Sequence, residues 1–363
     1  MCWFTVKDWI LWTQQLHMLQ RYFSRLAPLL MVCYLGTGFM ACNNNSQKVV
    51  DVSKVAVPFE AVRYDKLLQQ CDTTRTMVWL DSVRALHPDF TDIYFQEMAG
   101  FVNRNDSNGV EKGMNYFLRQ PDYIGLQDTV NFRYPDTKKQ DAALNELFQY
   151  VRYYFPKTKY SKVYYFVSGL NHWSAVTVDT VIAVGLDMYL GSSYPFYASV
   201  QLADYQTARC IPEYIPINVA QVIEEDMFPF KPENKTLLDL MLIKGKQQLF
   251  LEYVLPTSDE EKRYGYTKEQ LAWCQENEAM MWHYFAKRNL LYSTQWQEMM
   301  RYVNDGPTST GMPAESPGNI GAWVGHQIIK AYMKKHPEKT FVEVMQMTMD
   351  SQTFLRESGY KPM

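Results

Sequence analysis

The sequence predicts an α+β fold, in which a small β-sheet is combined with a mainly helical body. Two uninterrupted apolar runs, at 163–168 and 180–187, are typical of strands that are buried on both faces. Much of the remaining chain carries apolar residues at three- and four-residue spacing, as amphipathic helices do. Because 47% of the 363 residues are hydrophobic, the chain can bury a full core. We therefore expect a single α+β domain over 55–363.

A secretory leader is expected at the N-terminus, over 1–41. Arg21 and Arg25 precede an apolar run at 26–40, which ends in small residues. This order of charged, apolar and small residues is typical of a signal peptide. The run is shorter than the roughly 20 apolar residues of a membrane-spanning helix, and two glycines interrupt it. The true start is open between Met1 and Met18, because the later start gives a shorter leader.

Cys42 is the expected site of lipidation. Residues 39–42, FMAC, resemble a bacterial lipobox, in which a small residue precedes the cysteine that receives a diacylglycerol and becomes the new N-terminus. Phe39 stands where leucine is usual, so ordinary cleavage and an uncleaved anchor remain alternatives. The polar stretch that follows, over 42–54, is predicted to be a flexible tether. Acylated Cys42 would then bind the protein to a lipid bilayer.

The cysteines that remain after the leader give no sign of a metal site. Cys71, Cys210 and Cys274 are an odd number, so they allow one disulfide at most, and no pair has the spacing of a metal knuckle. We expect three separate core cysteines.

The secondary-structure elements follow from the patterns in order. A first strand is expected at 55–63, at an edge of the sheet, because Pro58 cannot donate to a strand ladder. A loop around Gly169 and Asn171 is expected to join the two buried strands. Helices are predicted over 64–84, 91–101, 141–155, 217–228, 235–255, 268–289, 295–304 and 320–335, with prolines and loops between them.

Composition and motifs exclude several classes of function. The net charge of -3 and the lack of a block of Lys or Arg argue against nucleic-acid binding. The chain has no GxGxxG, GxxxxGK[ST] or GxSxG sequence, so no cofactor and no serine nucleophile is indicated. Two acidic clusters, 224–226 and 259–261, are typical of solvated helix ends. Most of the many Trp and Tyr residues are expected in the core or at its rim.

A zinc peptidase would need two imidazoles one helical turn apart, as HExxH provides. That motif is absent. The histidines after the leader share no metal-ligand spacing, and each alone is typical of a surface or packed residue; they are His87, His172, His283, His326 and His336.

An ordered series of short segments resembles the gliding-motility lipoprotein B family of Bacteroidetes. The series covers most of the mature chain and includes DMYLG at 187–191, IPEYIP at 211–216, LLDLMLIKGK at 237–246, Gly306-Pro307 and SPGNIGAWVG at 316–325. That family is in turn similar to predicted HExxH peptidases. The resemblance therefore implies a degenerate zincin-like metallopeptidase fold.

The same resemblance implies where the degenerate cleft lies. QVIEE at 221–225 would occupy the place of HExxH, and Lys244-Gly245 would replace the Glu-Gly of a second helix. The candidate cleft residues are therefore Gln221, Glu224, Glu225 and Lys244, with no metal, no cofactor and no catalytic residue. Lys244 is expected to form an ion pair, within about 4 Å, with Glu224 or Glu225.

The function expected from these observations is that of a non-catalytic envelope lipoprotein. The resemblance implies a role in a gliding-motility or secretion assembly, with other envelope proteins as partners. The lack of an acidic run after Cys42 favours a periplasm-facing location and leaves the membrane itself open. Two alternatives remain: a zinc peptidase that uses His283, His326 and Glu278, and a lipoprotein that binds glycans through exposed aromatic residues.

Overall fold

The computed structural model describes residues 49–99, 107–231 and 233–362. Contacts divide the chain into two compact units, Met1–Val50 and Asp51–Met363, and the second of these is described below. The leader predicted over 1–41, the lipidation site Cys42 and most of the tether predicted over 42–54 lie outside the described residues.

The predicted α+β class is confirmed, with a four-stranded mixed sheet in the order β1-β2-β4-β3. Strands β1 (Glu60–Arg63), β2 (Lys162–Phe166) and β4 (Val181–Gly185) are parallel, while β3 (Ala175–Val178) is antiparallel to β4. The central strands β2 and β4 are buried almost throughout, as their apolar runs predict. The edge position of β1 is also confirmed, although the strand begins at Glu60 and not at Val55.

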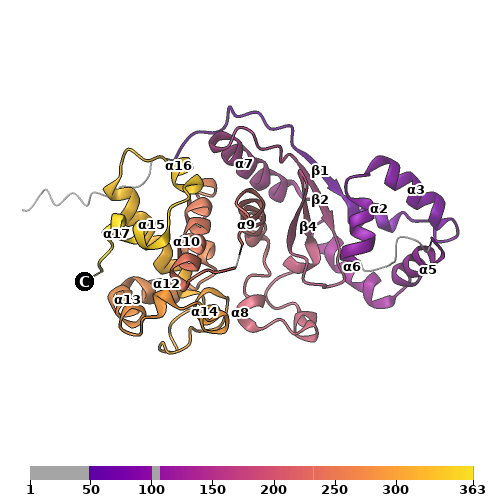
Figure 1. Cartoon of the computed structure of the whole chain (residues 1–363). Helices are drawn as coiled ribbons and strands as arrows, with labels where there is room; N and C mark the ends of the chain where they lie inside the picture. Colours follow the sequence, from indigo (N-terminus) through magenta and orange to yellow (C-terminus); the bar gives the residue numbers. More distant parts are fainter. Residues whose placement is uncertain (1–48, 100–106, 232, 363) are drawn as a thin grey trace, which may run out of the picture. The chain divides into compact units, whose positions relative to one another are not determined.

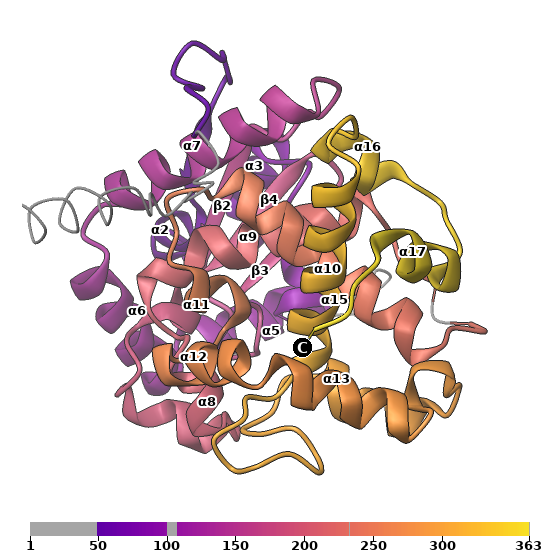
Figure 2. The same cartoon turned by 90° about the vertical axis from the view of Figure 1, so that its left-hand side faces the viewer.

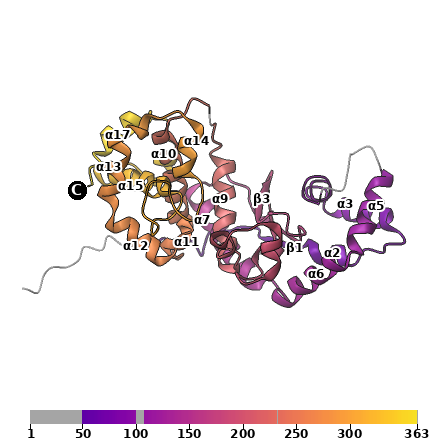
Figure 3. The same cartoon turned by 90° about the horizontal axis from the view of Figure 1, so that it is seen from below.

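Helices cover both faces of the sheet (Figures 1 and 3). On one face, Tyr164, Phe166 and Ala183 pack in a core with helices α2 (Tyr64–Gln69) and α3 (Thr76–Leu86). On the other face lie α7 (Lys138–Tyr154) and α9 (Ile215–Met227). The hydroxyl of Tyr165 in β2 donates to Asp141 of α7 at 2.8 Å, and α9 contacts β3 and β4. Helix α9 therefore lies between the sheet and the helical body that the later residues form.

Several predicted elements are divided in the structure. The single helix predicted over 64–84 is wrong, because a turn separates α2 from α3, and Asp72 accepts hydrogen bonds there from the Thr74 amide and hydroxyl at 2.9 and 2.7 Å. The helix predicted from residue 91 is a short α4 (Thr91–Ile93) that continues as a π-helix, η1 (Tyr94–Met98). Strand β3 was not predicted, and neither were several helices, among them α5 (Ser107–Leu118) and α6 (Pro121–Arg133).

The centre of the helical body is the crossing of α10 (Leu237–Val254) and α15 (Ile320–Lys335), which lie side by side in Figure 2. Glycines make this close approach possible. A Cβ added at Gly325 would lie 1.8 Å from the Met241 carbonyl oxygen, and one added at Gly245 would lie 2.4 Å from the Gly325 carbonyl carbon. The structure confirms the bounds predicted for α15.

Shorter elements complete the unit around this crossing. The helix predicted over 268–289 is divided at Asn277 into α12 and α13. These shorter elements are η2 (Leu186–Tyr189), η3 (Pro195–Val200), α8 (Asp204–Thr207), η4 (Pro212–Tyr214), α11 (Glu260–Tyr264), α12 (Lys268–Glu276), α13 (Glu278–Lys287), η5 (Leu290–Tyr292), α14 (Trp296–Val303), α16 (Phe341–Gln346) and α17 (Ser351–Ser358).

The cysteines within the described chain are unpaired. Cys210 and Cys274 are buried, Cys71 is half-buried, and all three are free thiols, in agreement with the sequence prediction. Among the helices of the described ranges, none combines the length and the apolar character that a bilayer crossing requires.

Candidate functional site

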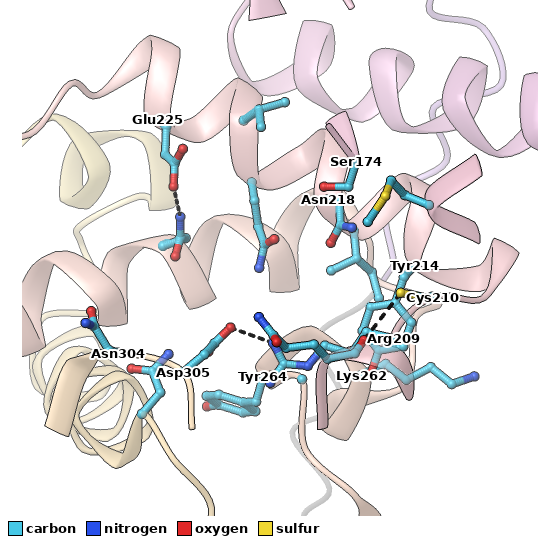
Figure 4. Close-up of a pocket in the computed structure, with 18 of the residues that line it drawn as sticks. Ser174, Arg209, Cys210, Tyr214, Asn218, Glu225, Lys262, Tyr264, Asn304 and Asp305 are labelled. Carbon is cyan, nitrogen blue, oxygen red and sulfur yellow. Dashed lines mark hydrogen bonds and ion pairs between the residues drawn. The ribbon is translucent and has the colours of Figure 1, made fainter. Parts of the chain in front are cut away.

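A polar cleft of about 570 Å³ lies where α9, α10 and α11 meet the segments that follow β4 and α14. Figure 4 shows most of the side chains that line it, which come from segments far apart in the sequence. Most of them carry amide, hydroxyl or charged groups. Those used below are His172, Arg209, Asn218, Gln221, Glu225, Lys244, Gln247, Gln248, Tyr264, Asn304 and Asp305.

Two helices supply the long wall of this cleft. Helix α9 buries its apolar face, including Ile217, Ala220 and Ile223, and it packs on β3 and β4. The helical period then turns Asn218, Gln221 and Glu225 toward the cleft. Helix α10 begins at a capping box, in which Thr236 and Asp239 bond each other's backbone amides. Its residues Lys244, Gln247 and Gln248 lie within one turn of one another and line the same cleft.

The four residues predicted from the sequence are brought together on these two helices. Gln221, Glu225 and Lys244 line the cleft, whereas Glu224 is buried and is not among its lining residues. The predicted ion pair is wrong, however, because among the described residues Lys244 forms none with Glu224 or Glu225. Instead the Lys244 ammonium donates to Oε1 of Gln247 at 3.5 Å. Nε2 of Gln247 in turn donates to Glu225 at 3.3 Å and to Glu224 at 3.4 Å.

Two physical reasons explain why this ion pair does not form. Gln247 stands one turn after Lys244 on α10, and its amide lies between the ammonium and both carboxyl groups. In addition, burial and the neighbouring Glu225 raise the pKa of Glu224 to about 8. Glu224 is therefore mostly protonated near neutral pH, and a neutral carboxyl group offers little attraction to an ammonium.

A strained loop delivers His172 to the cleft. Leu170 and His172 both have φ of 61°, in the left-handed region that favours glycine. The loop is fixed by Asp187, which is fully buried and accepts hydrogen bonds from the Ser168 amide and hydroxyl and from the Leu170 amide, at 2.8 to 3.0 Å. Strain of this kind persists where surrounding contacts enforce it, and it is concentrated at functional sites.

An ion pair joins two distant segments at the cleft. Arg209, which follows α8, contacts Asp305, which follows α14, at 2.6 Å (Figure 4). The guanidinium also packs on Gly265, where an added Cβ would lie 2.5 Å from its central carbon. Gly265 has a φ of 71°, so both the backbone and the close contact require glycine.

The residues of the zinc-peptidase alternative do not form a metal site. His326 is buried in α15, with Nδ1 2.6 Å from the Tyr264 hydroxyl and Nε2 3.3 Å from Glu252, and burial lowers the pKa of its imidazole to about 4. Glu278 accepts a hydrogen bond from the Tyr360 hydroxyl at 2.8 Å. Within the described ranges, no three His, Cys, Asp or Glu side chains group in a way that suits a metal ion.

Part of the cleft could have been predicted from the sequence. Asn218 and Gln248 lie at helical spacing from Gln221 and Lys244, so the faces of the two helices would have identified them. No local pattern pairs Arg209 with Asp305, which are 96 residues apart.

The comparisons with known proteins agree with the resemblance seen in the sequence. The model of a family described as gliding motility protein GldB matches residues 45–362, which is most of the chain. Comparison with curated proteins gave no match, and comparison with solved structures gave none.

Proposed function

Because the chain belongs to the gliding motility protein GldB family, we propose that it is an envelope lipoprotein that supports a motility or secretion assembly by binding its partners without catalysis. Cys42 is the proposed lipid anchor. The folded unit would then be held at a membrane surface, periplasm-facing, where its cleft binds other envelope proteins.

The arrangement of Glu225, Gln247 and Lys244 is the observation that carries the non-catalytic part of the proposal. A zinc site needs several neutral imidazoles, thiolates or carboxylates that converge on one point. Here an amide and an ammonium stand beside the carboxylate of Glu225. An ammonium opposes a divalent cation by like-charge repulsion, and an amide is a weak ligand for zinc.

The cleft has the chemistry of a binding site. Side-chain amides from Asn218, Gln221 and Gln248 each carry both donors and acceptors, so they can satisfy the polar groups of a ligand. The strained loop at His172 and the Arg209–Asp305 ion pair fix two sides of the cleft. A site that is formed in advance loses less entropy when its ligand binds.

The test combines genetics with metal analysis. In a gliding bacterium whose own family member has been deleted, expression of this chain is expected to restore colony spreading or secretion. The lipoprotein purified from that strain is expected to contain far less than one zinc ion per chain and to show no peptidase activity. Failure to restore either phenotype would contradict the assembly role. Stoichiometric zinc that is lost together with activity in His326→Ala or Glu278→Ala would contradict the non-catalytic role.

A further inference from the structure

A second cavity adjoins the polar cleft and has a different character. This apolar trough, of about 410 Å³, is lined mainly by Phe228, Phe230, Leu240, Ile243, Trp296 and Met300. Phe230 and Trp296 stand on different elements, and they remain 41% and 49% exposed. Large aromatic side chains that are half exposed around one cavity are typical of a surface that buries an apolar group of a partner.

The trough and the polar cleft adjoin each other, and the two together are called the groove. Both cavities are lined by Glu225, Lys244 and Gln247 and, on the opposite side, by Val303 and Asn304. The hydrogen-bonded group of Glu225, Gln247 and Lys244 therefore stands at the junction. A ligand that passes this point has amides and charges on one side and aromatic rings on the other.

The charge at this groove favours an acidic partner. Lys244 stands at the junction, and Lys231 and Lys235 line a neighbouring cavity that shares Phe228, Phe230 and Ile243 with the trough. Within the described part of the chain, none of these three lysines has an ion pair with a carboxylate. Two acidic residues oppose them: Glu225, which already accepts a hydrogen bond from Gln247, and Glu224, which lines the trough and the neighbouring cavity and is mostly protonated near neutral pH because its pKa is raised to about 8.

We propose that this groove binds an extended polypeptide segment of a partner, with an apolar side chain between Phe230 and Trp296 and a carboxylate at Lys244. This inference rests on the proposed function and names the surface that performs it. The side-chain amides of the cleft suit a peptide backbone, which presents one donor and one acceptor at almost every residue. The aromatic walls of the trough suit an apolar side chain.

Selection from a random peptide library tests the proposal directly. The full lipoprotein, purified in detergent, is expected to enrich displayed peptides that contain one large apolar residue and one Asp or Glu. A synthetic peptide from the enriched set is then measured by fluorescence polarisation. The double variant Phe230→Ala/Trp296→Ala is expected to bind it at least tenfold more weakly. Phe132→Ala, at a site 89% exposed on α6, is the matched control and is expected to bind normally.

A change of specificity distinguishes a binding role of Lys244 from a structural one. Lys244→Glu is expected to select peptides with Lys or Arg in place of Asp or Glu, and Lys244→Met is expected to lose the preference for charge. Lys138→Glu, at a side chain 85% exposed, is expected to keep the original preference. Because a merely unfolded variant would select nothing, the altered preference reports recognition.

Three results would overturn the proposal. The wild-type protein enriches no peptide, the enriched peptides bind the groove variants and the wild type equally, or the groove binds a polysaccharide in their place. If spreading is restored by the chain while any of these results holds, the proposed function stands and the groove is not its binding site. If spreading is not restored, peptide binding that depends on the groove still supports the groove as a site.

Discussion

The carboxyl groups of Glu224 and Glu225, which are neighbours on α9, lie in different environments. Glu225 is exposed at the groove, whereas Glu224 is 6% exposed and sits between α9 and α10. Burial is the largest cause of the raised pKa of Glu224, and repulsion by Glu225 adds to it, while Lys244 and Gln247 oppose the change. A sequence of two glutamates carries no sign of this difference, because it depends on which one the helix turns inward.

The buried Glu224 makes stability fall as the pH rises. Its pKa is about 8 in the folded chain, above its ordinary value of 4.5, so the folded state binds more protons than the unfolded state between these two values. The contribution of protonated Glu224 to the free energy of unfolding is complete below about pH 4.5 and is lost as the pH rises through 8. The full shift corresponds to roughly 3–5 kcal/mol.

We therefore expect Glu224→Gln to remove this loss. At about pH 5 the variant and the wild type should have free energies of unfolding within about 1 kcal/mol, and at about pH 9 the variant should be more stable by roughly 3 kcal/mol. Urea denaturation at both pH values measures this. Glu315→Gln, at an exposed loop position, should keep the wild-type slope. Parallel stability curves for Glu224→Gln and the wild type would show that Glu224 is ionised in the fold.

At the scale of elements, the structure depends on how closely α10 and α15 approach. Gly325 and Gly245 contact the backbone of the opposite helix, and no side chain fits between them. This crossing fixes where α10 lies, and α10 carries Lys244 and Gln247 to the groove. A substitution at the crossing would therefore change both the stability of the fold and the position of the α10 side chains at the groove.

The expected result of Gly325→Ala is a loss of about 3 kcal/mol or more of folding free energy, because the new methyl group would force the helix backbones apart. Gly125→Ala is the matched control. It places the same methyl group at an exposed position of α6, where nothing lies within 4 Å of the added Cβ. It is expected to stabilise the protein by up to about 1 kcal/mol, since alanine favours a helix. Thermal denaturation compares the two, and equal effects would refute the crossing argument.

Some elements could be predicted and others could not. The bounds of α15 follow from its periodic apolar residues. The break at Asp72 was missed because the apolar spacing continues through the turn, whose hydrogen bonds to Thr74 are made by side chains. Strand β3 was missed because it lies at an edge and is mostly half-buried, so its apolar pattern is weaker than that of β4.

At the scale of the whole molecule, the proposed anchor at Cys42 would limit where the groove can act. Cys42 precedes the folded unit, which begins at Asp51, by nine residues. At about 3.4 Å per residue, this length of chain spans about 30 Å at most. A lipid on Cys42 would therefore hold the start of the folded unit close to a membrane surface.

Replacement of the anchor is expected to release the protein. Cys42→Ser removes the thiol that receives the lipid, so the protein should leave the membrane fraction or accumulate as an unprocessed precursor. Fractionation of cells after labelling with a radioactive fatty acid measures both outcomes. Cys71→Ser, in the folded unit, is the control and should remain labelled and membrane-bound. A processed Cys42→Ser protein that stays in the membrane fraction would contradict the lipid anchor.

The sequence by itself determined the α+β class, the buried central strands, the helices that carry the site and the place of Gln221, Glu225 and Lys244 on them. The class, the strands and the helices follow from apolar periodicity, which is a local property of the chain, whereas the choice of those three residues followed from the resemblance to the family. Only the tertiary structure decided that Gln247 separates Lys244 from the carboxyl groups, that Glu224 is buried, and that Arg209 meets Asp305. Such contacts depend on the packing of distant segments, and no local spacing encodes which side chains the fold brings within hydrogen-bonding distance.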